Sequence, residues 1–116
     1  MKNYADLYNY ILKGKNKVSR TIANNTTARL ENNGDIIITL HSTDICILQS
    51  DNTRTFYTGG WYTVTTKERI NRFMPAPYKV YQADYSWYVW NCRTQERVCE
   101  FCNGLTITGS GEVLTV

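Results

Sequence analysis

His41 is the only histidine in the chain and the first residue to consider for catalytic chemistry. Ser42, Thr43 and Asp44 follow it directly, so an imidazole, two hydroxyls and a carboxylate are neighbours in sequence. A catalytic triad, however, is recognised by its geometry and not by local order. The sequence also lacks a phosphate-binding glycine loop, a metalloprotease motif and a dinucleotide-binding fingerprint. We therefore expect no catalytic residues, and predict that the protein is not an enzyme.

The four cysteines raise the question of a metal site. Cys99 and Cys102 have the spacing of half a zinc site, which Cys92 or His41 could complete. A second pair with this spacing is missing. Cys46 and Cys99 also fall inside strand-like patterns, where a cysteine acts as a small buried hydrophobe. We expect free thiols, no metal and no cofactor.

Binding chemistry has better support in the middle of the chain, where basic and aromatic residues are interleaved. Such residues together can hold phosphates and stack bases. The simpler interpretation is a solvated helix face beside buried aromatics, which the modest net charge of +3 favours. The basic residues are Arg54, Lys67, Arg69 and Arg72, and the aromatic residues are Tyr57, Trp61 and Tyr62.

A second aromatic segment runs from Trp87 to Trp90. In a strand, Trp87 and Val89 share one face, while Tyr88 and Trp90 share the other. Aromatics on both faces mean either burial on both sides or one exposed aromatic patch, and an exposed patch would mark a binding surface. The candidate partner-binding residues are therefore Arg54, Trp61, Lys67, Arg69, Arg72, Trp87 and Trp90.

The composition limits the classes of protein that fit. A length of 116 residues suits one domain, residues 1–116, and a hydrophobic content of 42% predicts a folded core and not a disordered tail. A net charge of +3 excludes a mimic of DNA, which needs an acidic excess. No apolar run approaches the roughly 20 residues of a membrane span, and the first residues show no signal-peptide pattern. We expect a cytoplasmic protein without a membrane partner.

The element that can be predicted most firmly is an N-terminal helix over about residues 3–13. Asn3 can cap it, and Gly14 ends it. The helix either packs on the protein's own sheet, which is the simpler interpretation, or pairs with a second copy in a homodimer. Its apolar stripe consists of Tyr4, Leu7, Tyr8, Ile11 and Leu12.

A β-meander is predicted for about residues 26–64, after a basic connector over residues 13–20 with little order of its own. Asn33-Gly34 is a strong hairpin signal, because both residue types tolerate positive φ. The pattern places Ile36, Ile38 and Leu40 on one face of the following strand. Residues 61–64 read as the last, aromatic strand of the meander.

The paired glycines Gly59-Gly60 and the residues after them organise the second half of the chain. Thr65 and Glu68 have the spacing of a capping box, so we expect a helix over about residues 66–74 that the following prolines end. Glu68 and Arg72 are spaced to pair with each other. Residues 78–116 are predicted to form C-terminal hairpins.

The predicted fold class is therefore α+β and mostly β. We expect a bent antiparallel sheet or a small, partly open barrel, with the N-terminal helix and the short central helix packed against it.

Two segments of the sequence resemble a family of small proteins of tailed bacteriophages and prophages. They are Leu40-His41-Ser42-Thr43-Asp44-Ile45 and the long run from Gly59-Gly60-Trp61 to Ile70-Asn71-Arg72. The resemblance covers about residues 20–108, includes the segments 22–27, 87–89 and 101–107, and leaves out the N-terminal helix and the cysteines. The family is uncharacterised, so the resemblance implies a phage origin and no catalytic residues.

These observations favour an accessory phage protein that binds and inhibits a host factor. An anti-defence protein of the anti-CRISPR kind is the leading case. One alternative is a module that binds nucleic acid through Arg54, Lys67, Arg69 and Arg72 with Trp61. Another is a pocket of the same residues that sequesters a nucleotide signal. The expected partner is a host protein, with nucleic acid or a second copy of the chain as the other candidates.

Overall fold

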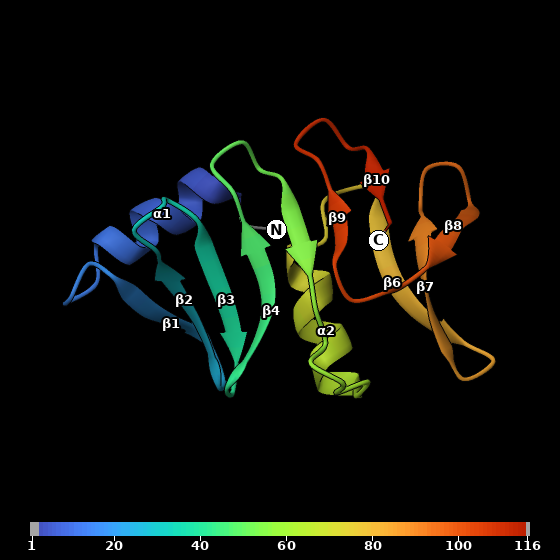
Figure 1. The fold of residues 1–116 in the computed structure, drawn as a ribbon, viewed down its shortest axis with the longest axis horizontal. Coiled ribbons are helices and arrows are strands. Elements are labelled where there is room, and N and C mark those ends of the chain that lie inside the picture. Colours follow the sequence, from blue (N-terminus) through green and yellow to red (C-terminus); the bar gives the residue numbers. More distant parts are fainter. Residues whose placement is uncertain (1–2, 116) are drawn as a thin grey trace.

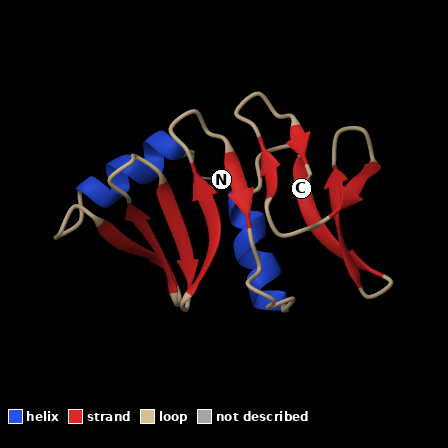
Figure 2. Cartoon of the chain, in the orientation of Figure 1, coloured by secondary structure: helices blue, strands red, loops and turns tan. Residues whose placement is uncertain are grey.

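The computed structural model describes residues 3–115, and it confirms the predicted class: the fold is α+β and mostly β. The strands form one seven-stranded and one three-stranded sheet, all antiparallel, instead of one bent sheet or a barrel (Figures 1 and 2). In chain order the elements are α1 (Tyr4–Leu12), β1 (Ser19–Ala23), β2 (Thr26–Leu30), β3 (Ile36–Leu40), β4 (Thr43–Leu48), β5 (Arg54–Phe56), α2 (Val64–Phe73), β6 (Tyr78–Ala83), β7 (Ser86–Asn91), β8 (Glu96–Glu100), β9 (Leu105–Ile107) and β10 (Val113–Leu114).

Helix α1 lies where the apolar periodicity predicts it. The side chain of Asn3 accepts a hydrogen bond of 2.9 Å from the backbone N–H of Asp6, which satisfies one of the free donors at the helix start. Leu7 and Ile11 are fully buried in the core formed with β1, β2 and β3. Burial of each side chain contributes about 2 kcal/mol, so packing on the protein's own sheet holds this helix in place.

Strand β1 lies at the start of the sheet, and the sequence prediction missed it. Residues 13–20 were expected to be an unordered basic connector, yet Ser19 to Ala23 pair with β2. Every residue of β1 is at least partly exposed, because the strand is an edge with one hydrogen-bonded neighbour. An edge strand needs no apolar alternation, so its sequence carries no strand pattern.

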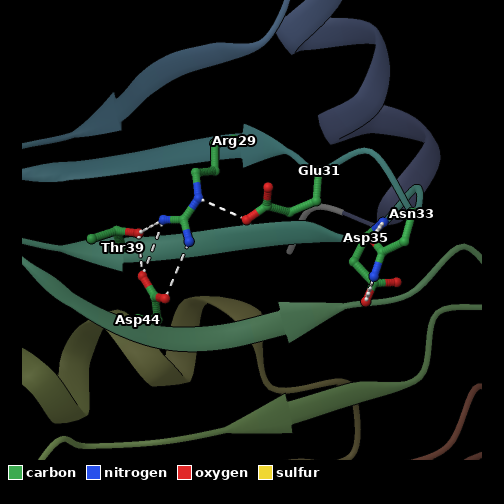
Figure 3. Close-up of polar contacts among 6 residues, drawn as sticks. All are labelled: Arg29, Glu31, Asn33, Asp35, Thr39 and Asp44. Atoms are coloured by element: carbon green, nitrogen blue, oxygen red, sulfur yellow. Dashed lines mark hydrogen bonds and ion pairs between the residues drawn. The ribbon is translucent and has the colours of Figure 1, made fainter.

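Strands β2 to β5 form the predicted meander. The β2–β3 turn contains Gly34 with φ of 93°, and the side chain of Asn33 accepts a hydrogen bond of 2.9 Å from the backbone of Asp35. On the other side of this sheet from the helices, Arg29 binds the carboxylates of Glu31 and Asp44 (Figure 3). The inner face carries the predicted row Ile36, Ile38 and Leu40, all buried.

The last strands of the seven-stranded sheet come from the far end of the chain. β9 pairs with β5, and β10 pairs with β9. The hydroxyls of Thr55 and Thr106 lie 2.9 Å apart across this junction. The predicted C-terminal hairpins are therefore divided, because β6, β7 and β8 form the second sheet while β9 and β10 complete the first.

Helix α2 begins earlier than predicted, and the strand expected over residues 61–64 is absent. Thr63 is the N-cap and its hydroxyl accepts a hydrogen bond of 3.2 Å from the N–H of Thr66, so Thr65 and Glu68 do not form the capping box. Gly59 and Gly60, with φ of 62° and 88°, turn the chain out of the sheet before the helix starts. The helix contacts β4 and β6, and thereby joins the two sheets (Figure 1).

The three-stranded sheet has two different faces, as the aromatic alternation predicts. Trp87 and Val89 are buried, whereas Tyr88 and Trp90 are partly exposed on the opposite face. The β6–β7 turn is tight, and Tyr85 at its centre has φ of 65°. Of the helices in residues 3–115, none is both long and apolar enough to span a bilayer.

Candidate interaction site at the turn edge

Four turns lie along one edge of the molecule, the lower edge in Figure 1. They are the β1–β2 turn, the β3–β4 turn, the loop before α2 and the β6–β7 turn, and we call them together the turn edge. The backbone N–H of His41 donates a hydrogen bond of 2.7 Å to the carbonyl of Asn25, which joins the first two turns. Three segments of the phage resemblance, residues 22–27, 40–45 and 59–72, therefore meet at this edge.

A pocket of about 420 Å³ opens between the β3–β4 turn and the start of α2. A Cβ atom on Gly59 would lie 2.6 Å from Cγ2 of Thr43, so only glycine allows the loop to come this close. The lining of this pocket is rich in hydroxyls and contains no carboxylate, lysine or arginine. The lining residues are Leu40, His41, Ser42, Thr43, Trp61, Thr63, Thr65 and Thr66.

The loop before α2 is hydrogen-bonded to the C-terminal part of the chain. The side-chain oxygen of Asn103 accepts hydrogen bonds from the backbone N–H and the hydroxyl of Thr58, at 2.7 and 3.0 Å. The Thr58 hydroxyl in turn accepts a hydrogen bond of 3.1 Å from Gly60. Because Thr58 is fully buried, these bonds fix the Gly59-Gly60 turn in one arrangement.

Large apolar side chains gather on the turn edge. The ring of Tyr62 lies edge-on against Trp87, with centroids 4.9 Å apart, and shares with Tyr85 a second pocket of about 300 Å³. Trp87 also contacts Phe101 and forms the buried base of this cluster. Four exposed residues of this edge form what we call the turn-edge patch: Trp61 (62% exposed), Tyr62 (52%), Val64 (77%) and Tyr85 (99%).

The basic residues of α2 are largely engaged within the protein. Arg69 donates hydrogen bonds to the Thr26 hydroxyl and the Asn24 carbonyl at 2.9 and 3.3 Å, and it also pairs with Glu68. Arg72 pairs with the same carboxylate at 2.7 Å, as its spacing predicts. Burial disfavours the charged carboxylate, but the hydrogen bonds from both arginines outweigh it and lower the pKa of Glu68. One carboxylate thus offsets two of the cations expected to bind phosphate.

The structure also corrects the placement of two candidate residues on a binding surface. Arg54 is 3% exposed, and its guanidinium donates a hydrogen bond of 2.7 Å to the carbonyl of Phe73 at the end of α2. Trp87 is 4% exposed. Both side chains are buried and not on the open surface: Arg54 contacts the C-terminus of α2, and Trp87 belongs to the core, where it lines the pocket of about 300 Å³.

The remaining candidates lie on different surfaces. Trp61 is on the turn edge, and Lys67 has its ammonium nitrogen 5.9 Å from the centroid of the Trp87 ring. Trp90 is on the outer face of the three-stranded sheet. Val64 and Tyr85 were not among the predicted candidates, although a large aromatic residue at the centre of a tight hairpin turn, such as Tyr85, indicates exposure.

The cysteines are all free thiols in this structure. Burial raises the pKa of Cys46 to about 12, and burial together with Cys102 raises the pKa of Cys99. Across residues 3–115, no group of at least three histidine, cysteine, aspartate or glutamate side chains is arranged to hold a metal ion.

Neither the curated proteins nor the solved structures contain a match to the chain. The model of the Kyanoviridae Gp96 protein family matches residues 2–108. This match includes α1, which the resemblance from sequence left out. The chain therefore belongs to the Kyanoviridae Gp96 protein family, a family of phage proteins.

Proposed function

We propose that this protein is a non-enzymatic phage accessory protein that binds a host protein through the turn-edge patch and inhibits it in the cytoplasm of the infected cell. The observation that carries the proposal is the exposure of four large apolar side chains along one edge. Exposed apolar side chains gathered on one part of a surface are typical of protein-binding sites. Tyrosine and tryptophan are also the residue types that most often dominate the binding energy of interfaces.

The framework beneath the patch favours tight binding. The Asn103–Thr58 hydrogen bonds and the contact of Tyr62 with Trp87 hold the loop in place before any partner arrives. A loop that is already ordered loses less conformational entropy on binding than a mobile one. The patch therefore has the preorganisation that an inhibitor of a host protein requires.

The chemistry of the neighbouring pocket supports a binding role over catalysis. His41 is exposed, and the Thr63 hydroxyl donates a hydrogen bond of 3.0 Å to the hydroxyl of Thr66 instead of facing a base. Within residues 3–115 no described hydrogen bond joins the imidazole to a hydroxyl or a carboxylate. A nucleophile and its base are normally within hydrogen-bond reach of each other.

The family supports a target in the bacterial host. A phage protein acts during infection, when host proteins are its surroundings, and a small protein with a preorganised aromatic surface is suited to block one of them. A host defence system, with an anti-CRISPR role as the leading case, is the target we propose to test first. Expression of the protein should then restore plating of a sensitive phage on cells that carry the defence system.

Quantitative capture from a lysate of the phage's host tests the proposal. Val64 is the first residue of α2, so Val64→Asp places a charge in the patch while favouring the helix N-terminus. We expect it to reduce the recovery of a specific partner at least about tenfold, as loss of a binding hot spot does. Val18→Asp, a matched change at an exposed valine outside the patch, should leave recovery unchanged.

Two results would overturn the proposal. One is the absence of any specific partner together with a failure to protect phage from every defence system tested. The other is a specific partner that Val64→Asp and Val18→Asp retain equally well, since the interface would then lie elsewhere.

A further inference from the structure

The outer face of the three-stranded sheet carries a basic and aromatic surface that the proposed function does not use. Cross-strand partners lie on the same face of a sheet. Lys79 pairs with Trp90, and Trp90 pairs with Arg97. One row across the sheet therefore places an indole ring between two cations. In the next row Tyr81 pairs with Tyr88. We call these five residues the Trp90 face.

The rings of the Trp90 face pack against one another and remain partly exposed. Tyr81 lies between the other two rings, 5.6 Å from Trp90 and 5.9 Å from Tyr88 between centroids. The guanidinium of Arg97 lies 3.7 Å above the centre of the Tyr88 ring, and its Nε donates a hydrogen bond of 2.8 Å to the Tyr81 hydroxyl. Trp90 and the stacked guanidinium plane are thus two flat surfaces, held in place by their neighbours.

The cations of this face differ from those of α2. Lys79 and Arg97 are exposed, and neither takes part in an ion pair within residues 3–115. The opposite face of the same sheet is core, with Val80 and Val89 buried. The hydrogen bond between Arg97 and Tyr81, followed by smaller contributions that include the charge of Asp84, raises the pKa of Arg97, so a carboxylate acts on this face without forming an ion pair. Both cations can still reach a partner outside the protein.

We infer that the Trp90 face binds single-stranded RNA. Unpaired bases stack on aromatic rings and on arginine planes, and phosphates bind the cations beside them. The row Lys79–Trp90–Arg97 offers a stacking surface with a positive charge on each side, which matches a base between two phosphates. A duplex hides its base faces and cannot stack in this way.

Glu100 favours RNA over DNA. It pairs with Tyr88 across the sheet, and it also lines the pocket that Tyr62 and Tyr85 share. A carboxylate repels a phosphate backbone unless it accepts a hydrogen bond, and the 2′-hydroxyl of RNA supplies a donor that DNA lacks. This inference rests on residues outside the turn-edge patch, so it stands or falls separately from the proposed function.

Fluorescence anisotropy with labelled oligouridine, a single strand without stable structure, tests the inference. The wild-type protein should bind it with an affinity that falls as salt rises. Trp90→Ala should weaken binding about tenfold or more, because one stacked base is lost. Because Trp90 is partly buried, the exposed variants Lys79→Ala and Arg97→Ala provide a second test that does not disturb the core. Each should reduce the slope of log affinity against log salt by about 0.7.

Matched controls assign the binding to this face. Trp61→Ala removes an exposed tryptophan of the turn edge, and the double variant Lys13→Ala, Lys15→Ala removes two exposed cations of the N-terminal connector. Neither control should change the affinity for oligouridine by more than about twofold. In the double lysine variant this limit includes the small, long-range electrostatic effect of the two lost charges. Oligodeoxyuridine of the same length should bind more weakly than oligouridine.

Four results would overturn the inference. They are salt-insensitive or undetectable binding of oligouridine, equal affinity for oligodeoxyuridine, an unchanged salt slope in Lys79→Ala and Arg97→Ala, and a loss in the control variants as large as that in Trp90→Ala.

Discussion

The exposed Trp61 and the partly exposed Trp90 lie on surfaces that differ in charge. Trp61 lies on a loop beside a hydroxyl-lined pocket that contains no carboxylate, lysine or arginine. Trp90 lies in the middle of a sheet row between two cations, Lys79 and Arg97. The turn-edge patch therefore fits the apolar surface of a protein, and the Trp90 face fits a charged, stacking partner.

The two regions differ in whether the fold pairs their cations with a carboxylate. Arg69 and Arg72 belong to the basic cluster of α2, yet both pair with Glu68. Arg97 contacts two aromatic residues instead: its guanidinium lies 3.7 Å from the centre of the Tyr88 ring and donates a hydrogen bond to the Tyr81 hydroxyl. Packing beside aromatics positions a cation without neutralising it.

The largest effect we expect is from Asn103→Ala, which should act on the turn edge alone. The change leaves the fully buried N–H and hydroxyl of Thr58 without their acceptor, so it should lower the free energy of unfolding by about 3 kcal/mol. Urea denaturation measures this loss. Asn103→Asp keeps an acceptor oxygen and should lose less.

In the folded fraction of Asn103→Ala, partner capture should fall while oligouridine binding is retained. The reverse pattern would contradict the division into two surfaces.

Gly59→Ala should have the next largest effect, roughly 2 kcal/mol of stability, because it combines an unfavourable positive φ with a contact between the new Cβ and Thr43. Gly60→Ala is the matched control, since it also has positive φ but meets no atom within 4 Å. The difference in thermal unfolding between the two variants isolates the steric contact. Thr43→Ser should relieve it when combined with Gly59→Ala, and equal losses in both single variants would show that the close approach is unimportant.

A smaller effect is expected on the Trp90 face. Arg97→Lys preserves the charge but replaces the flat guanidinium over Tyr88 with an ammonium group. Oligouridine affinity should fall roughly fivefold, equivalent to about 1 kcal/mol of stacking, while the salt slope stays the same. A changed slope with unchanged affinity at low salt would mean that Arg97 acts only as a charge.

The smallest effect concerns Asp44, which lies on neither proposed surface and so provides a neutral reference. The hydrogen bonds from Arg29 and Thr39 lower its pKa, while burial opposes the shift. The folded state therefore holds the proton less tightly than the unfolded state, and the ion pair stabilises the protein above the unfolded pKa. This stabilisation is lost as pH falls through the lower, folded pKa. Because the side chain is 47% exposed, the effect should stay below about 1 kcal/mol.

Denaturant unfolding of Asp44→Asn against pH measures this contribution. The wild-type protein should be the more stable at neutral pH, and the difference should vanish in acid below the folded pKa. Partner capture and oligouridine binding should both be unchanged. A stability difference that persists in strong acid would mean that Asp44 acts by packing and not by charge.

Local patterns in the sequence were sufficient to predict the elements that local physics determines. The periodicity of Leu7 and Ile11 predicted α1, and Asn33-Gly34 predicted the first hairpin turn of the meander. The pairing of β5 with β9 could not be predicted in this way. It joins residues 54–56 to residues 105–107, and no local pattern encodes a contact over that separation.

The candidate site was predicted less well, for a reason visible in single residues. Arg54 and Phe56 alternate with Thr55, so they share a face of β5, and the burial of Phe56 implies the burial of Arg54. That signal was present in the sequence. The engagement of Arg69 by Thr26 and Asn24 was not, because it depends on the turn edge bringing α2 beside the β1–β2 turn.

The most direct test of the central claim is the recovery of a host partner by wild-type protein, Trp61→Ala and Trp90→Ala, measured side by side by quantitative mass spectrometry. If the turn-edge patch is the protein interface, Trp61→Ala should lose the partner and Trp90→Ala should recover as much as the wild type. Equal recovery by all three proteins, or loss only with Trp90→Ala, would contradict the assignment of protein binding to the turn edge.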